Sequence, residues 1–358
     1  MIICITSSKM SVLMNSERLD LYFALQKKGA LLITLTHDVS TIREVLALNY
    51  IDGDCVDGII FEEPIWGKKL NFSTMFKDAA NYKIPKATFI TDYFLEIAYT
   101  RRYIEQNNID IIFTPHQTSI SYLYDIYPTV KTIAHAPFCI VEEYFLDLTD
   151  KDIDILDTVQ HHPVTPLRNK ISKVASKMKG IEYVKLPHPG KREANTNAIV
   201  GKKYIDYLHR SFFTIACTTS YKVSVRKYWE IYASGGIVIG DRLQLPEHSF
   251  FKDNIVEISE VDSAKKITYL IEMAIDKKQN MSTNSFKLQE LIINYAGRNN
   301  VSDIIINTMQ SEECIAIAIS KNSKFCKKIA SSDLPIYHNL HNKFDLMRSY
   351  IKSIVKNT

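Results

Sequence analysis

The sequence predicts an α/β protein with two consecutive lobes, each formed by a largely parallel sheet with helices between its strands. Short apolar runs alternate with longer segments of helical periodicity, which is typical of βαβ units. The alternation runs through two successive series of roughly 150 residues each, the size of an open α/β lobe. The chain of 358 residues is also long enough for two domains that each bury a core.

Each of the two series alternates expected strands with expected helices. In the first, strands are expected at residues 2–5, 31–35, 58–61, 86–91, 110–114 and 131–134, with helices at 16–28 and 92–107. In the second, strands are expected at 154–158, 183–187, 212–217, 236–240 and 255–258, with helices at 165–179, 202–211, 225–233 and 263–276. An acidic stretch without periodicity joins them, so we expect domains at 1–148 and 149–310 and a C-terminal segment at 311–358.

The composition of the chain disfavours several classes of protein. Hydrophobic residues make up 46% and charged residues 23% of the chain, which is typical of a globular protein. The net charge of +4 falls short of the clustered positive charge of nucleic-acid-binding proteins. The six cysteines are scattered without metal-ligand spacing, and no run approaches the roughly 20 apolar residues that span a bilayer. We therefore expect a cytoplasmic protein with no transmembrane segment and no nucleic-acid partner.

Several cofactor motifs are absent from the sequence. The turn after the first strand reads Thr6-Ser7-Ser8-Lys9 rather than G-x-G-x-x-G, and no P-loop occurs. A dinucleotide-dependent dehydrogenase and a P-loop NTPase are therefore disfavoured. The acid pairs Asp52/Asp54 and Asp152/Asp154 could in principle chelate a metal, but two acids in a loop are common. We expect no metal and no bound cofactor.

The segment of residues 226–241 has the strongest functional signal. A helix is expected to start after Ser224 and to end at the Gly235-Gly236 pair before a buried strand. Arg226 and Lys227, beside the free N–H groups of that helix, would suit a pyrophosphate, and Glu230 one turn later could accept both hydroxyls of a ribose. The alternative is a surface helix with solvated charges and an i,i+4 ion pair, and composition alone favours that alternative.

Residues 227–235 (Lys-Tyr-Trp-Glu-Ile-Tyr-Ala-Ser-Gly) resemble the donor-binding helix of GT-B glycosyltransferases of the group 1 type. Further segments upstream resemble the same family in the same order. In the second lobe these are 154–157 followed by 165–168, the turn His188-Pro-Gly, 201–204 and 216–220. In the first lobe the likeness is looser and lies at 91–92 and 135–138. It covers about residues 86–310. The resemblance implies two Rossmann-like lobes with a deep interlobe cleft, and a C-terminal segment that packs back on the first lobe.

The same resemblance implies an enzyme that transfers a hexosyl or pentosyl group from a nucleotide sugar to a hydroxyl of a glycan or related acceptor, without a metal. A UDP- or GDP-sugar is favoured over a CMP-sugar. Arg168, His188, Lys222, Arg226, Lys227 and Glu230 are the candidate donor-binding residues. His188 follows a strand at the edge where open α/β sheets bind ligands, although a plain turn histidine fits equally well.

Two departures from the family pattern stand out. Many retaining members carry Glu-x7-Glu here, and Lys222 stands where the first acid would be, so the retaining signature is broken. The glycine expected after the first strand of the second lobe is also missing, because Val159-Gln-His-His162 fills that turn. The sequence thus supports nucleotide-sugar binding better than a particular stereochemistry.

Asp92 and His135 are the candidate catalytic residues. Each follows an apolar strand of the first lobe, and an inverting displacement needs a base for the proton of the acceptor hydroxyl. Asp92 could instead cap a helix that starts at Tyr93. Two other functions stay open: a nucleotide-sugar epimerase or hydrolase on the same fold, and a non-catalytic module that binds a sugar nucleotide or glycan.

Overall fold

A computed structural model describes residues 1–7, 17–36, 39–65, 75–145, 150–158, 165–187, 199, 201–219, 223–243, 251–252, 254–282 and 285–310. The chain divides into two compact units. Of the described residues, those within 1–7, 21–137 and 302–310 form unit 1, and those within 17–20 and 138–301 form unit 2. The predicted segment 311–358 lies outside the described residues.

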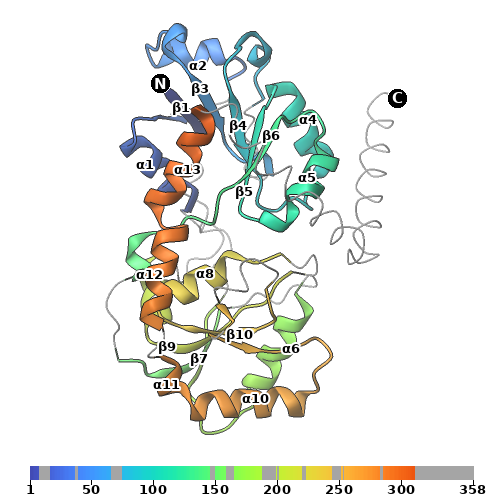
Figure 1. Cartoon of the computed structure of the whole chain (residues 1–358), viewed down its shortest axis with the longest axis vertical. Helices are drawn as coiled ribbons and strands as arrows, with labels where there is room; N and C mark the ends of the chain where they lie inside the picture. The colour runs from blue at the N-terminus through green and yellow to red at the C-terminus, as the bar shows by residue number, and fades with distance from the viewer. Residues whose placement is uncertain are drawn as a thin grey trace. The chain divides into compact units, whose positions relative to one another are not determined.

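Unit 1 is built on a six-stranded parallel sheet in the order β2-β1-β3-β4-β5-β6. The strands are β1 (Ile2–Ser7), β2 (Leu31–Leu35), β3 (Gly58–Phe61), β4 (Lys86–Phe89), β5 (Ile111–Thr114) and β6 (Thr132–His135). Its helices are α1 (Glu17–Lys27) from Leu21 onward, α2 (Ile42–Leu48), α4 (Ile97–Asn107), α5 (Ile120–Ile126) and the last part of α13 (Arg298–Gln310). Helices α1 and α13 lie on one side of the sheet, and α4 and α5 on the other (Figure 1).

Unit 2 is built on a five-stranded parallel sheet in the order β11-β10-β9-β7-β8. The strands are β7 (Ile153–Asp157), β8 (Tyr183–Lys185), β9 (Ser211–Ile215), β10 (Ile237–Gly240) and β11 (Ile255–Glu257). The helices include α6 (Pro166–Ala175), α7 (Lys202–His209), α8 (Arg226–Ala233), α10 (Ala264–Asp276), α11 (Lys278–Ser282) and α12 (Ser285–Ala296). Short 3-10 turns at Gly53–Cys55, Ala79–Asn81, Gln117–Ser119 and Glu142–Phe145 complete the described elements.

The sheet of unit 2 is buried on both faces. Alternate residues of β10 point to opposite sides: Val238 packs with α8 and α12, whereas Ile237 and Ile239 pack with α6 and α10. Strand β9 follows the same rule, with Phe213 and Ile215 on the α6 and α10 side. The continuous apolar runs that predicted buried parallel strands are therefore explained by two separate layers of helices.

The predicted α/β architecture with two parallel sheets is confirmed, and each predicted strand is present with ends shifted by a few residues. One helix differs clearly. The sequence predicted a helix over 92–107, but α4 begins at Ile97, after Glu96 in the left-handed region with a φ of 51°. Asp92 therefore does not cap a helix that starts at Tyr93, and the capping alternative is wrong.

Candidate functional site

The strand order of unit 2 has its reversal point between β7 and β9. The chain passes from β7 to β8 on one side and from β9 to β10 and β11 on the other, so the strand order reverses between these two neighbours. In open parallel sheets, ligands bind beyond the carboxyl ends of the strands at this reversal. Thr158 follows β7 and Cys217 lies just beyond β9, so both are at this edge.

Helix α8 begins at the same edge. It follows Val225, whose side chain has no polar group to cap the first N–H groups, and its first turn carries Arg226 and Lys227. The Lys227 ammonium donates to Thr158 Oγ1 and, at 3.2 Å, to the hydroxyl of Tyr204, and it lies 5.1 Å from the centre of the Tyr204 ring. A helix N-terminus with two cations is a favourable place for an anion.

Burial changes the acid–base behaviour of Lys227. It lowers the pKa of the ammonium to about 8, and the nearby Glu230 carboxylate partly opposes the shift. Lowering of a lysine pKa by desolvation is the usual response to burial. A further negative charge placed beside Lys227 would therefore stabilise its charged form.

Glu230 is buried at the centre of this cluster. Its Oε2 accepts from the hydroxyl of Tyr204 at 2.9 Å, and its Oε1 accepts from the hydroxyl of Tyr144 at 3.3 Å. Arg226 Nε lies 3.3 Å from Oε1, and the two side chains are only 10% and 7% exposed. The i,i+4 pair is therefore present, but the interpretation as a solvated surface helix is wrong, because these charges are buried.

Tyr204 and Tyr144 are residues that the sequence did not identify. Tyr204 lies on α7, and its hydroxyl connects Glu230 with Lys227. Burial and the neighbouring Glu230 raise the pKa of Tyr204 well above its ordinary value, so it stays a hydrogen-bond donor. The sequence motif at 201–204 contained Tyr204 without a role, and no local signal connects Tyr144 with a carboxylate 86 positions away.

Arg168 reaches the same edge from α6. One terminal nitrogen donates to the carbonyl of Cys217 at 2.8 Å, which directs the guanidinium to the end of β9. Its Nε is buried and finds no acceptor in the described part of the chain. Arg168, Arg226, Lys227 and Glu230 therefore gather at one edge of unit 2, whereas His188, Lys222 and the turn 159–162 lie outside the described residues.

Asp241 fixes the neighbouring strand ends. Its carboxylate accepts from the backbone N–H of Thr218 at 2.8 Å and from the hydroxyl of Tyr228 at 3.0 Å, so it ties β9 and α8 to the end of β10. Gly240, the residue before it, has no room for a side chain: a Cβ there would lie 1.7 Å from the carbonyl oxygen of Ala216. The end of β10 can approach β9 this closely only with glycine.

In unit 1, both candidate bases lie at the carboxyl edge of the sheet. Asp92 occupies the turn between β4 and α4, where its carbonyl accepts from the N–H of Leu95 at 2.9 Å. His135 is the last residue of β6, and its Nε2 lies 3.2 Å from the carbonyl of Pro115. Strand β5 separates β4 from β6, so the two candidates follow strands that are not neighbours.

Two further polar residues at this edge escaped the sequence analysis. Glu63, after β3, is buried, and its Oε1 accepts from both the N–H and the hydroxyl of Thr91 at 2.6 Å. His116, after β5, is also buried, and burial lowers its pKa to about 3 although a hydrogen bond with the Thr91 backbone opposes the shift. Glu63 and His116 thus both hold the Thr91 backbone next to Asp92.

His135 is neutral in this environment. Burial lowers its pKa to about 4, and the hydrogen bond with Pro115 opposes the shift. A neutral imidazole can accept a proton, which keeps His135 a chemically possible base. Glu63 and His116 could have been found from the sequence as polar residues within two positions of the end of an apolar strand, β3 and β5 respectively.

No group of three or more histidine, cysteine, aspartate or glutamate side chains within the described residues could hold a metal ion. None of the described helices combines the length and the apolar character needed to cross a membrane.

Comparison with known proteins identifies the fold. No protein-family model and no curated protein matches the sequence. Solved structures do match: sucrose-phosphate synthase from Thermosynechococcus elongatus has a TM-score of 0.60 at 10% identity, covering 86% of this chain and 98% of that one. HepE of Anabaena in complex with UDP has a TM-score of 0.57 at 10% identity, covering 86% and 99%.

An α-glucosyltransferase in complex with UDP and a 13-mer DNA is also similar, with a TM-score of 0.55 at 13% identity, covering 87% of this chain and 100% of that one. Together these matches show that the chain has the two-lobed GT-B glycosyltransferase fold, as the sequence motifs implied.

Proposed function

We propose that this protein is a glycosyltransferase that moves a sugar from a nucleotide sugar to a hydroxyl group of a glycan or related acceptor. The donor binds to unit 2 and the acceptor to unit 1. The observation that carries the proposal is the gathering of Arg168, Arg226, Lys227 and Glu230 where β7, β9 and the first turn of α8 meet. The fold shared with glycosyltransferases supports it.

The diphosphate is assigned to the start of α8. Arg226, Lys227 and the first N–H groups of the helix offer positive charge in a partly buried place, where it acts more strongly than in water. When the bond between the sugar and the diphosphate breaks, negative charge grows on the leaving phosphate. Cations already positioned there stabilise that charge, so the arrangement favours the transition state over the bound donor.

The ribose is assigned to Glu230. A carboxylate has about four acceptor positions, and the hydroxyls of Tyr204 and Tyr144 take two of them. The ribose hydroxyls therefore either occupy the other two or displace one tyrosine. In both cases Tyr204 becomes a neighbour of the nucleotide.

A UDP-sugar is the preferred donor, with a GDP-sugar next and a CMP-sugar last. Two of the structurally similar proteins were crystallised with UDP, which supports this order. A hexosyl or pentosyl group would be transferred without a catalytic metal, because Arg226 and Lys227 can offset the charge of the leaving diphosphate. The transfer rate is therefore expected to stay unchanged in the presence of a chelator.

The acceptor is expected to be a glycan rather than a nucleic acid, because the net charge of the chain is only +4. We assign its activation to Asp92, with His135 as the second candidate. As the acceptor oxygen forms its bond to the anomeric carbon, its proton passes to the base and the nucleoside diphosphate leaves. Asp92→Asn should abolish most of the transfer, and a rate near that of the wild type would remove Asp92 from this role.

Loss of the Glu230 carboxylate tests the donor site. Glu230→Ala should weaken UDP binding by roughly 1–3 kcal/mol, the usual effect of losing hydrogen bonds to a charged group. Isothermal titration calorimetry measures this, with Glu272→Ala, an exposed position on α10, as the matched control. Equal UDP affinity in the wild type and in Glu230→Ala would refute the ribose assignment.

A further inference from the structure

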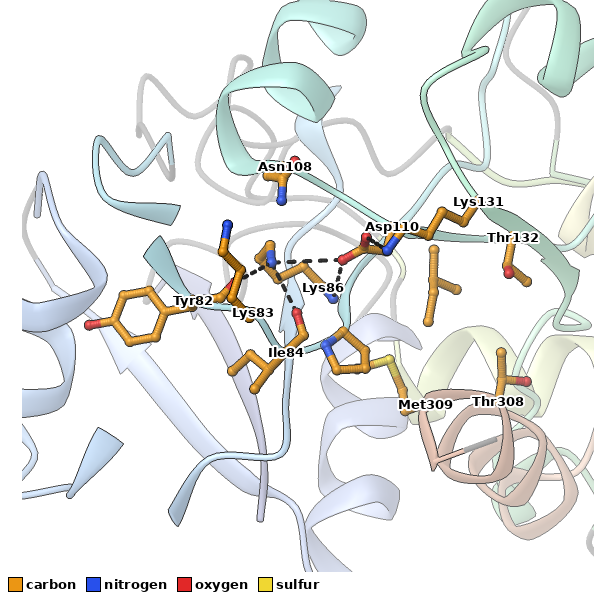
Figure 2. A pocket seen from close by; sticks show the side chains of 12 residues that line it. Tyr82, Lys83, Ile84, Lys86, Asn108, Asp110, Lys131, Thr132, Thr308 and Met309 are labelled. Carbon is orange, nitrogen blue, oxygen red and sulfur yellow. Dashed lines mark hydrogen bonds and ion pairs between the residues drawn. The ribbon is translucent and has the colours of Figure 1, made fainter. Parts of the chain in front are cut away.

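A cavity of about 300 Å³ opens at the edge of the unit 1 sheet opposite to the one just described. It lies at the amino ends of β4, β5 and β6, where Lys86, Ile111 and Thr132 are the first residues of their strands. Thr308 and Met309 of α13 form its far wall (Figure 2). Its volume is at the lower end of the range of small-molecule sites, about 300–1,000 Å³.

A buried lysine forms the floor of this cavity. The Lys86 side chain is 1% exposed, and its ammonium donates to the carbonyls of Tyr82 at 2.8 Å and Ile84 at 2.9 Å. Asp110 Oδ2 lies 3.7 Å from the same ammonium. Two carbonyls and one nearby carboxylate therefore hold the Lys86 ammonium as a fixed positive charge on the floor of the cavity.

Charge is unbalanced around the cavity. Asp110 is the only carboxylate among the described residues that line it, and it pairs with both Lys86 and Lys131, at 2.9 Å from the Lys131 ammonium. Lys83 adds a third ammonium, whose described bond goes to the neutral carbonyl of Ala80 at 3.1 Å. Three ammonium groups thus face one carboxylate, which leaves an excess of two positive charges.

The cavity has both polar and apolar lining residues. Lys83 and the amide of Asn108 point toward the same space on one side, and the Thr132 hydroxyl faces the cavity on the other (Figure 2). Pro85, Ile111 and Met309 supply an apolar wall. The Lys131 side chain is 76% exposed, so it can swing toward an incoming anion while Asp110 keeps Lys86 as a partner.

We propose that this cavity binds a small molecule that carries a phosphate monoester on an apolar or ring-shaped body. A phosphate monoester carries a charge of about −1.5 to −2 at pH 7, which matches the excess of two positive charges. Its oxygens accept from Lys83, Lys131 and the amide of Asn108, and its body lies against Pro85, Ile111 and Met309. The site is separate from the proposed donor site and does not depend on the transfer reaction.

Phenyl phosphate is a suitable probe, because it combines the phosphate monoester with an apolar ring. Phosphorus NMR titration of the full chain should show saturable binding of one equivalent. The double variant Lys83→Ala/Lys131→Ala should bind at least about tenfold more weakly, since two charge-assisted contacts are lost. Arg226→Ala, in the proposed donor site, should leave this binding unchanged.

The matched control is Lys27→Ala/Lys77→Ala, which removes the same charge from two exposed lysines of unit 1 outside the cavity. It should retain the affinity of the wild type. Benzoate, which has the ring but only a carboxylate, should bind at least about tenfold more weakly than phenyl phosphate. The proposal is overturned if phenyl phosphate does not bind, or if benzoate binds as tightly as phenyl phosphate. It is also overturned if Lys83→Ala/Lys131→Ala keeps the affinity of the wild type, or if both double variants lose the same affinity.

Discussion

At the scale of single residues, Tyr204 has an unusual position between Glu230 and Lys227. Its hydroxyl donates to the first and accepts from the second, at 2.9 and 3.2 Å. Tyr204→Phe removes both bonds and leaves two buried charges with one partner fewer. The free energy of unfolding should fall by about 1–3 kcal/mol.

UDP should recover part of this loss if a ribose hydroxyl takes the position of the Tyr204 hydroxyl beside Glu230. The rise in melting temperature on adding UDP is then larger for Tyr204→Phe than for the wild type, as measured by thermal unfolding. Tyr207→Phe on the same helix provides the control and should behave like the wild type. An equal rise in all three proteins would show that no ribose hydroxyl takes the position of the Tyr204 hydroxyl.

Lys227 makes the proposed donor site sensitive to pH. Its pKa of about 8 in the free protein means that it loses its charge as the pH rises through 8. A bound diphosphate favours the charged form, so UDP should bind less tightly above pH 8, and binding at pH 8.5 should be accompanied by proton uptake.

Calorimetry in buffers of different ionisation enthalpy measures this uptake. Lys227→Arg is the informative comparison, because arginine keeps its proton at every accessible pH. The variant should bind UDP without taking up a proton. Proton uptake of the same size in Lys227→Arg would show that another group is responsible.

Sequence reasoning recovered one part of this cluster and missed the other. Arg226, Lys227 and Glu230 lie on one helix, and a local pattern can carry their likeness to a known motif. Tyr144 comes from a 3-10 turn far away in the chain, and Tyr204 from α7, so only the folded sheet brings them to Glu230. Whether a charge is buried or solvated is likewise a property of the fold. The sequence alone therefore does not distinguish a buried α8 from a surface helix with solvated charges.

At the scale of elements, the contact between β9 and β10 depends on Gly240. A Cβ at this position would lie 1.7 Å from the Ala216 carbonyl oxygen, and backbone cannot move aside as a flexible side chain can. Gly240→Ala should therefore lower the free energy of unfolding by more than about 3 kcal/mol and misplace Asp241, which follows it.

Chemical denaturation measures the effect on stability. Gly53→Ala is the control, since its Cβ would meet only the Leu46 side chain at an ordinary 3.7 Å. That substitution should change stability by no more than about 0.5 kcal/mol. A small effect for Gly240→Ala would mean that the two strands separate more easily than their packing indicates.

The start of α4 shows why helix boundaries are hard to predict. The sequence from Asp92 onward has helical character, yet the helix begins only at Ile97. Glu63 binds both the N–H and the hydroxyl of Thr91, and Glu96 adopts a φ of 51°, so the chain before α4 follows an irregular path. A partner 28 positions away along the chain sets this path, and local periodicity contains no sign of it.

At the scale of the whole molecule, the class of fold was predictable. Buried parallel strands appear as continuous apolar runs, and the runs 31–35 and 58–61 match β2 and β3 to the residue. The order of the strands was not predictable, because it depends on which edges pair after collapse. That order places Thr158 and Cys217 at one edge, and so it defines the proposed donor site.

The proposed transfer reaction requires unit 2 to bind the nucleotide part of a nucleotide sugar. Isothermal titration of the wild-type protein with UDP, GDP and CMP tests it most directly. UDP should bind at a single site and more tightly than CMP, and Glu230→Ala should weaken this binding. If none of the three nucleotides bound, the donor site at Arg226, Lys227 and Glu230 would be contradicted.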